Sequence, residues 1–253
     1  AALVVASPAR AQADPSRGSQ EQYFVVLLGD ERAGWMKETI SVDDGLITTA
    51  AQMRFEVGRG AATVRIDIST EFVEREDHTP VSMSSRQSIA SVPVETVYEF
   101  LGDTITVTST QQGRTSTREV PAPTEPWVTP ARASDIVRRA LDAGEPIPDL
   151  TTLDPSFGVT PITTSRTDPE MTTVEVFGRV VPAYRTMSSL STMPGSPSEE
   201  YIGLNGRLVR STTRMGGIAI TMLESEPELA LAEIDPPEVM RSTFIEPNRP
   251  IRN

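Results

Sequence analysis

The sequence contains no cysteine and only one histidine, His78. Without cysteine the chain can form no disulfide bond and can contain no thiol-dependent active site. A Ser-His-Asp site would have to use His78, but no G-x-S-x-G sequence accompanies it. Because His78 lies in a charged stretch between two expected strands, we interpret it as a solvated turn residue, with a histidine mechanism as the alternative. The residues single out no catalytic group, so whether this segment is an enzyme stays open.

Candidate metal ligands are equally scarce, because one histidine and no cysteine leave only carboxylates. Glu74, Glu76 and Asp77 are close in sequence, as are Asp43 and Asp44, but neither group fits the spacing of an EF-hand loop. We interpret both groups as charged turns, with a calcium site as the alternative. No metal site and no cofactor is predicted.

Positive charge and long apolar stretches are also limited. Lys and Arg number 23 against 35 Asp and Glu, which gives a formal net charge of -12. This balance argues against nucleic acid or an anionic membrane surface as a partner. Beyond the N-terminus no stretch reaches the ~18 apolar residues of a spanning helix, so no transmembrane segment is predicted after signal cleavage.

The N-terminal residues are typical of the end of a secretion signal. An apolar stretch over residues 1–6 is followed by Ser7 and Pro8, and Ala11 and Ala13 supply the small residues of an A-x-A cleavage site. We interpret residues 1–13 as a signal-peptide remnant, with a disordered alanine-rich tail as the alternative. The signal interpretation predicts an exported protein, periplasmic or extracellular.

What is abundant favours strands. The 21 prolines and the many Thr and Val residues argue against a helical bundle. Residues 23–28 form a short apolar run, and apolar side chains alternate with polar ones over residues 52–57 and 63–72, which is typical of antiparallel strands. Another strand is expected over residues 172–181.

Three turns predict hairpins with defined registers. A Gly102-Asp103 turn sets Phe100 opposite Ile105 and Tyr98 opposite Val107, so apolar residues share one face. Near the C-terminus, Asn205-Gly206 sets Ile202 opposite Val209, and Gly216-Gly217 sets Thr213 opposite Ile220.

Two helices interrupt the strands. The first is expected over residues 130–143, where Thr129 can cap the helix, Pro130 suits its first position and Gly144 closes it. Its apolar stripe consists of Ala133, Ile136, Val137, Ala140 and Leu141. A shorter helix over residues 226–234 is indicated by the capping-box spacing of Ser225 and Glu228.

Together these elements predict a mainly β (α+β) fold. We expect a large curved antiparallel sheet or half-barrel with one inserted α-helix and a short C-terminal helix. Residues 14–235 are predicted to form a single β domain, and residues 236–253 are interpreted as a linker toward a further domain.

The few aromatic residues are candidates for contact with an apolar ligand. They could line the concave side of a curved sheet, although such residues more often form a core. The candidate ligand-lining residues are Trp35, Phe55, Phe72, Tyr98, Phe100 and Trp127.

Four features in order carry a family resemblance. They are the opening hairpin over residues 28–35, the helix after a proline-rich crossover, the late hairpin over residues 201–210, and the terminal residues 247–251. In this order they resemble the N-terminal β module of exported bacterial transglutaminase-like proteins of papain-like fold. The pattern is also similar to the half-barrels of periplasmic lipid and lipoprotein carriers.

The first resemblance implies a non-catalytic accessory module that supports a downstream thiol-dependent domain of the same polypeptide. It also implies that the reading frame continues past Asn253 and encodes a cysteine. The second resemblance implies the alternative function, a stand-alone periplasmic carrier that binds an apolar lipid or acylated ligand, or a peptide, in its curved sheet.

Overall fold

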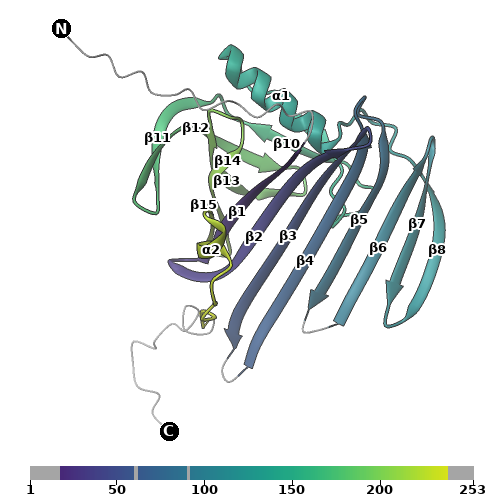
Figure 1. Cartoon of the computed structure of the whole chain (residues 1–253), viewed down its shortest axis with the longest axis horizontal. Coiled ribbons are helices and arrows are strands. Elements are labelled where there is room, and N and C mark those ends of the chain that lie inside the picture. Colours follow the sequence, from purple (N-terminus) through teal and green to yellow (C-terminus); the bar gives the residue numbers. More distant parts are fainter. Residues whose placement is uncertain (1–17, 60–61, 90–91, 239–253) are drawn as a thin grey trace.

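Antiparallel pairing between strands organises the chain in the computed structural model, which describes residues 18–59, 62–89 and 92–238 (Figure 1). Fifteen strands form one sheet in the order β8-β7-β6-β5-β4-β3-β2-β1-β15-β14-β13-β12-β10-β9, and β11 pairs with β12. The strands are β1 (Gly18–Leu28), β2 (Glu31–Asp43), β3 (Leu46–Arg59), β4 (Ala62–Arg75), β5 (Pro80–Ile89), β6 (Val92–Leu101), β7 (Thr104–Gln111), β8 (Arg114–Pro121), β9 (Leu150–Thr152), β10 (Ile162–Arg166), β11 (Glu170–Val176), β12 (Arg179–Leu190), β13 (Met193–Gly203), β14 (Leu208–Met215) and β15 (Ile218–Ser225). The helices are α1 (Pro130–Ala143) and α2 (Pro227–Ala230).

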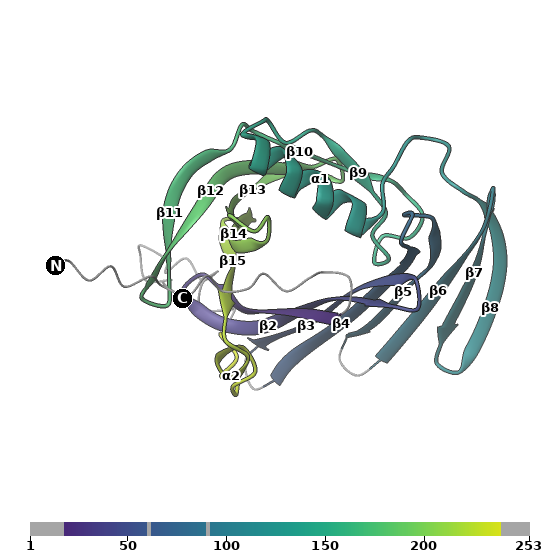
Figure 2. The ribbon, with the colours of Figure 1, turned by 45° about the horizontal axis from the view of Figure 1, so that its top comes forward.

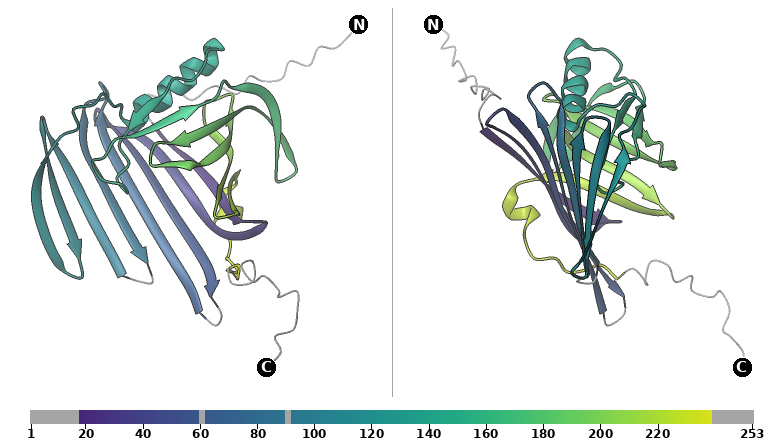
Figure 3. Two further views of the ribbon diagram at one scale, coloured as in Figure 1. Left: turned by 180° about the vertical axis from the view of Figure 1, so that it is seen from behind. Right: turned by 90° about the vertical axis from the view of Figure 1, so that its right-hand side faces the viewer.

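The sheet is curved but does not close. β8 and β9 are its two ends. In Figure 2 the end that carries β9, β10, β12 and β13 lies across from β2 to β6, and α1 lies against the strands of that end. The views in Figure 3 show the twist of the long strands and α1 along one margin of the sheet. The prediction of a large curved antiparallel sheet with one inserted helix and a short C-terminal helix is confirmed.

Tight turns explain why consecutive strands pair. Asp44-Gly45, Gln112-Gly113 and Phe177-Gly178 each place two successive residues at positive φ, between 48° and 75°. Positive φ at both central residues is the geometry of a type I′ turn, whose twist matches that of the strands it joins. Successive strands therefore lie side by side, and the chain builds the sheet as two meanders.

Two of the three predicted registers are confirmed. Phe100 lies opposite Ile105 and Tyr98 opposite Val107, as the turn at Gly102 requires. Thr213 lies opposite Ile220. Both hairpins follow from the turn residues alone, because a two-residue turn fixes every later pair.

The third register is wrong by one residue. Ile202 lies opposite Leu208 instead of Val209, with an irregularity between Tyr201 and Ile202. The turn is longer than Asn205-Gly206, because the Gly203 N–H donates to the carbonyl of Arg207 and the Arg207 N–H donates to Oδ1 of Asn205.

The prediction of one strand over residues 172–181 is also wrong. A hairpin turn at Phe177 and Gly178 divides this segment, so that Val174 pairs with Val181 across β11 and β12. Phe177 adopts a positive φ of 48°, which is unusual for an aromatic residue and hid the turn from the sequence pattern.

Helix α1 begins and ends where predicted. Pro130 is its first residue, and Gly144 ends it with a left-handed φ of 66°, donating its N–H to the carbonyls of Ala140 and Leu141. Thr129 is at the N-cap position, but its hydroxyl makes no capping bond. Val137, Ala140 and Leu141 are buried, and the helix packs on Leu150, Ile202 and Tyr184 of the sheet.

Helix α2 is shorter than predicted. It ends at Ala230 instead of Ile234, and Glu226, not Ser225, holds its N-cap position. The Nη2 of Arg32 donates to the carbonyl oxygens of both Ala230 and Ala232 at 2.7 Å. These carbonyls are thereby satisfied by a side chain, which lets the helix stop after one turn.

A hydrophobic core lies on the inner face of β4 to β7, the face that carries Phe72 and Tyr98. This cluster consists of Phe72, Met83, Tyr98, Ile105, Val107 and Leu153. Leu153 comes from the segment after β9, and Trp127, from the segment before α1, packs against the same cluster. Two connecting segments therefore cover part of the concave side of the sheet.

The predicted terminal segments fall largely outside the described residues. This holds for residues 1–13, interpreted as a signal remnant, and for residues 239–253 of the interpreted linker. Of the linker, Pro237 accepts a hydrogen bond from the Gly58 N–H at 2.8 Å, and Glu238 forms a parallel bridge with Gly58.

Candidate functional site

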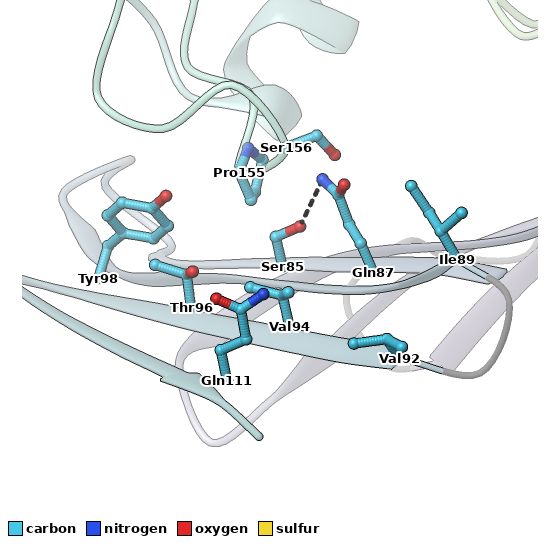
Figure 4. A pocket seen from close by; sticks show the side chains of 10 residues that line it. All are labelled: Ser85, Gln87, Ile89, Val92, Val94, Thr96, Tyr98, Gln111, Pro155 and Ser156. Atoms are coloured by element: carbon cyan, nitrogen blue, oxygen red, sulfur yellow. Dashed lines mark hydrogen bonds between the residues drawn. The ribbon is translucent and has the colours of Figure 1, made fainter. Parts of the chain in front are cut away.

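A pocket of about 420 Å³ opens on the inner face of β5, β6 and β7, beneath the segment that follows β9 (Figure 4). Side chains from the three strands point toward Pro155 and Ser156, which lie above them. The lining residues are Ser85, Gln87, Ile89, Val92, Val94, Thr96, Tyr98, Gln111, Pro155 and Ser156.

Strand alternation places these residues on one face. Every second residue of β6 from Val92 to Tyr98 lines the pocket, and Val94 lies opposite Gln87 on one side and Gln111 on the other. Since successive side chains of a strand point to opposite faces, antiparallel pairing brings these three residues together.

The covering segment is fixed by its own hydrogen bonds. Oδ1 of Asp154 accepts the Ser156 N–H at 2.7 Å, and the Asp154 carbonyl accepts the Phe157 N–H at 2.9 Å. Leu153, only 2% exposed, anchors the segment in the core. Pro155 and Ser156 are thus held over the strands as a turn.

Among the described residues, no charged side chain lines the pocket. Its polar groups are amides and hydroxyls, and the Gln87 Nε2 donates to Oγ of Ser85 at 3.4 Å. Isoleucine and valine at positions 89, 92 and 94 give one wall an apolar surface. Such a lining accommodates an uncharged group with apolar and hydrogen-bonding parts, and the volume is within the range of small-molecule sites.

Tyr98 forms the inner end of the pocket. Tyr98 is 8% exposed, and burial raises the pKa of its hydroxyl. The positive charge of Arg118 lowers this pKa by a smaller amount. At the other end Ile89 is 55% exposed and Val92 43% exposed. The pocket therefore runs from a buried tyrosine to an apolar rim.

The candidate aromatic residues do not gather at one site. Tyr98 alone among them lines the pocket. Phe55 is half-buried on the inner face opposite Gly34, whereas Trp35 lies opposite Arg54 and so faces the other side of the sheet. The expectation that Trp35 lines the concave side is wrong, because it is out of phase with Phe55.

Phe72 and Phe100 belong to the core. Their ring centroids are 6.0 Å apart, and Trp127 lies 6.3 Å from Phe72 and 5.9 Å from Phe100. These three rings fill the space beneath the segment before α1, as the core interpretation expects.

Most of the pocket residues were not among the residues predicted from the sequence. The alternation of Val92, Val94, Thr96 and Tyr98 was the available signal, since it extends the predicted hairpin face toward its open end. Pro155 and Ser156 gave none, because their position depends on how a connection folds back over distant strands.

The two acidic groups lie in adjacent turns, since the Glu76 N–H donates to the carbonyl of Gly45 at 3.2 Å. Glu74 is 1% exposed and pairs with His78, while Asp44 belongs to the turn between β2 and β3. Over residues 18–59, 62–89 and 92–238 there is no group of three histidine or acidic side chains arranged to hold a metal ion. Within the same ranges no helix has the length and apolar character needed to cross a membrane.

Comparison with known proteins supports the fold alone. No family model matches the sequence, and the search of curated proteins found no match. Among solved structures, the chain is similar to a β-barrel-like protein of the domain of unknown function DUF1849 from Brucella abortus, with 13% sequence identity and a TM-score of 0.60. The alignment covers 83% of this chain and 98% of the Brucella chain.

Proposed function

We propose that this protein is a carrier that holds the uncharged, largely apolar part of a ligand, such as an acyl chain with an amide or ester group, against the inner face of β5 to β7. The observation that carries this proposal is the pocket beneath Pro155 and Ser156, with its apolar wall and with no charged side chain among its described lining residues. Burying an ionised group there would be costly, since none of these lining side chains has an opposite charge.

The shape of the site supports an elongated ligand. The exposed side chains of Ile89 and Val92 extend the apolar wall to the rim of the pocket, so a chain entering there loses contact with water gradually. Gln87 and Gln111 offer amide donors and acceptors beside that path. An ester or amide can exchange hydrogen bonds with them while the chain packs on Val94.

The test is binding of the neutral apolar dye N-phenylnaphthylamine, followed by native mass spectrometry and lipid extraction of the purified protein. Val94→Trp fills the pocket, whereas Glu95→Trp places the same ring on the opposite face of the same strand. We expect dye binding to fall about tenfold or more in Val94→Trp and to stay unchanged in Glu95→Trp. Equal binding by all three proteins, each with an unchanged circular dichroism spectrum, would contradict the proposal.

The accessory-module function is a second candidate. It is favoured by β8, an eight-residue end strand that pairs only with β7 among the described strands and offers its other edge to an added strand. Its test is the downstream reading frame, which should encode a cysteine-containing domain; a stop codon soon after position 253 would exclude it. Export stays a prediction, checked by whether the mature protein begins at Asp14.

A further inference from the structure

A second and larger hollow, of about 580 Å³, lies on the opposite face of β2 to β6 from the inner pocket. We call it the arginine groove. Its lining includes Trp35, Arg54, Arg65, Asp67 and Arg86. Trp35, Arg54 and Asp67 pair directly across β2, β3 and β4, so their side chains share the outer face of the sheet.

One carboxylate orients two of the arginines. Oδ1 of Asp67 accepts the Arg54 Nε–H, and Oδ2 accepts the Arg65 Nε–H, both at 2.7 Å. Burial would raise the pKa of Asp67, but the two hydrogen bonds and the arginine charges together lower it. Because each arginine uses only Nε for Asp67, the Nη groups of both guanidiniums are left to bind a ligand.

The third arginine adds a charge that is not committed to a partner. Arg86 is exposed, and the described residues give it no hydrogen bond or ion pair. Glu56 flanks the groove at 4.0 Å from Arg65, and Glu95 lies opposite Arg86 on β6, but neither lines the groove. The lining itself carries three positive charges and one negative charge, in a chain of net charge -12.

An aromatic surface adjoins these donors. The Arg54 guanidinium carbon lies 5.7 Å from the centroid of the Trp35 ring. This cation–π contact places the guanidinium over the indole ring, so the two side chains form one part of the groove wall. An anion held by Arg54 therefore has a flat apolar surface next to it.

We propose that the arginine groove binds a phosphate monoester, with the phosphate among Arg54, Arg65 and Arg86 and the organic group against Trp35. Three terminal oxygens and up to two negative charges match several guanidinium donors better than the two oxygens of a carboxylate do. Such a phosphate belongs either to a soluble sugar phosphate or to a lipid headgroup. The site is independent of the carrier proposal, because it lies on the other face of the sheet.

The test is titration calorimetry of the whole chain with inorganic phosphate and glucose-6-phosphate, together with sedimentation of vesicles of phosphatidylcholine with or without phosphatidic acid. Arg86→Gln removes the uncommitted charge without breaking a hydrogen bond to any described residue. Arg114→Gln is the matched control, an exposed arginine on β8 outside the groove. We expect about tenfold weaker phosphate binding in Arg86→Gln, and no change in Arg114→Gln.

Trp35→Leu tests whether the organic group of the ligand contacts the indole. It should weaken glucose-6-phosphate more than inorganic phosphate if the organic group lies on the indole. Binding of the sugar phosphate identifies a soluble ligand, and binding only to phosphatidic acid vesicles identifies a headgroup. Absence of binding to every phosphate probe, or equal losses in Arg86→Gln and Arg114→Gln, would overturn the proposal, and neither outcome depends on dye binding in the inner pocket.

Discussion

Nδ1 of His78 lies 3.2 Å from Oε1 of Glu74 across the turn that joins β4 to β5. The carboxylate is almost fully buried, with 1% of its side chain exposed, and its Oε2 has no hydrogen-bond partner among the described residues. His78 itself has a left-handed φ of 67° and donates its backbone N–H to the Arg75 carbonyl. The single histidine is thus a partner of a buried acid and not a freely solvated turn residue.

We expect His78→Ala to lower the free energy of unfolding by about 1–3 kcal/mol, because the buried carboxyl of Glu74 loses its hydrogen-bonding partner. His78→Asn is the control, since asparagine tolerates positive φ and keeps a side-chain donor. Urea unfolding followed by circular dichroism measures both. If alanine and asparagine cost the same small amount, the contact with Glu74 contributes nothing.

Gly34 gives a prediction about strand pairing. A Cβ at this position would collide with the carbonyl oxygen of Arg54 on the neighbouring strand. Gly34→Ala should therefore separate β2 from β3 locally and destabilise the fold by about 1–3 kcal/mol.

Gly195→Ala is the matched control, because Gly195 also lies in a strand but has open space around the added atom. It should be neutral or slightly stabilising, since alanine restricts the unfolded chain. Thermal unfolding of the two variants compares them directly. A Gly34→Ala protein as stable as the Gly195→Ala protein would show that the strands separate without cost.

Phe72 distinguishes a core aromatic residue from a ligand contact. It is 2% exposed and touches Phe100 and Trp127, so Phe72→Ala should cost about 3–5 kcal/mol. Phe157, 52% exposed, should tolerate the same change within about 0.5 kcal/mol. Guanidinium unfolding measures both. A small loss at Phe72 would mean that the space beneath Trp127 is not a packed core.

Much of this fold could be predicted because turn chemistry is local. Gly102-Asp103 and Gly216-Gly217 set their registers correctly, and Pro130 and Gly144 mark both ends of α1. Each of these signals depends on φ and on hydrogen bonds within a few residues, so the residue types at the turn or helix end are enough to predict it.

The end of α2 was mispredicted because a distant contact decides it. The carbonyls that end α2 are bound by Arg32, about two hundred residues earlier in the chain. The candidate pocket depends on distant contacts in the same way: strand alternation could indicate Val94 and Gln111, but Pro155 takes its place because Leu153 packs into a core formed by β4 to β7. Hydrophobic alternation cannot say which connection folds over which face.

Glu38 is an acidic residue on the inner face whose surroundings do not favour its charge. It is half-buried on β2, opposite Gln22 of β1. The Gln22 Nε2 is already used, donating to the Leu208 carbonyl at 2.6 Å and to Oε1 of Glu224 at 2.9 Å. Burial raises the pKa of Glu38, and the positive charge of Arg207 offsets only part of that rise.

A raised pKa in the folded state has a definite consequence for stability. Below pH 4.5, the ordinary pKa of the group, the Glu38 carboxyl is protonated in both the folded and the unfolded state. As the pH rises from 4.5 through the raised pKa of the folded state, the carboxyl ionises more readily in the unfolded chain, so the folded state loses stability. Glu38→Gln stays neutral and should be more stable than the natural protein at neutral pH by about 1 kcal/mol. The advantage should shrink as the pH falls toward 4.5. Urea midpoints across this range test it, with exposed Glu95→Gln as the control; a difference that does not change with pH would show that Glu38 contributes through packing and not through its charge.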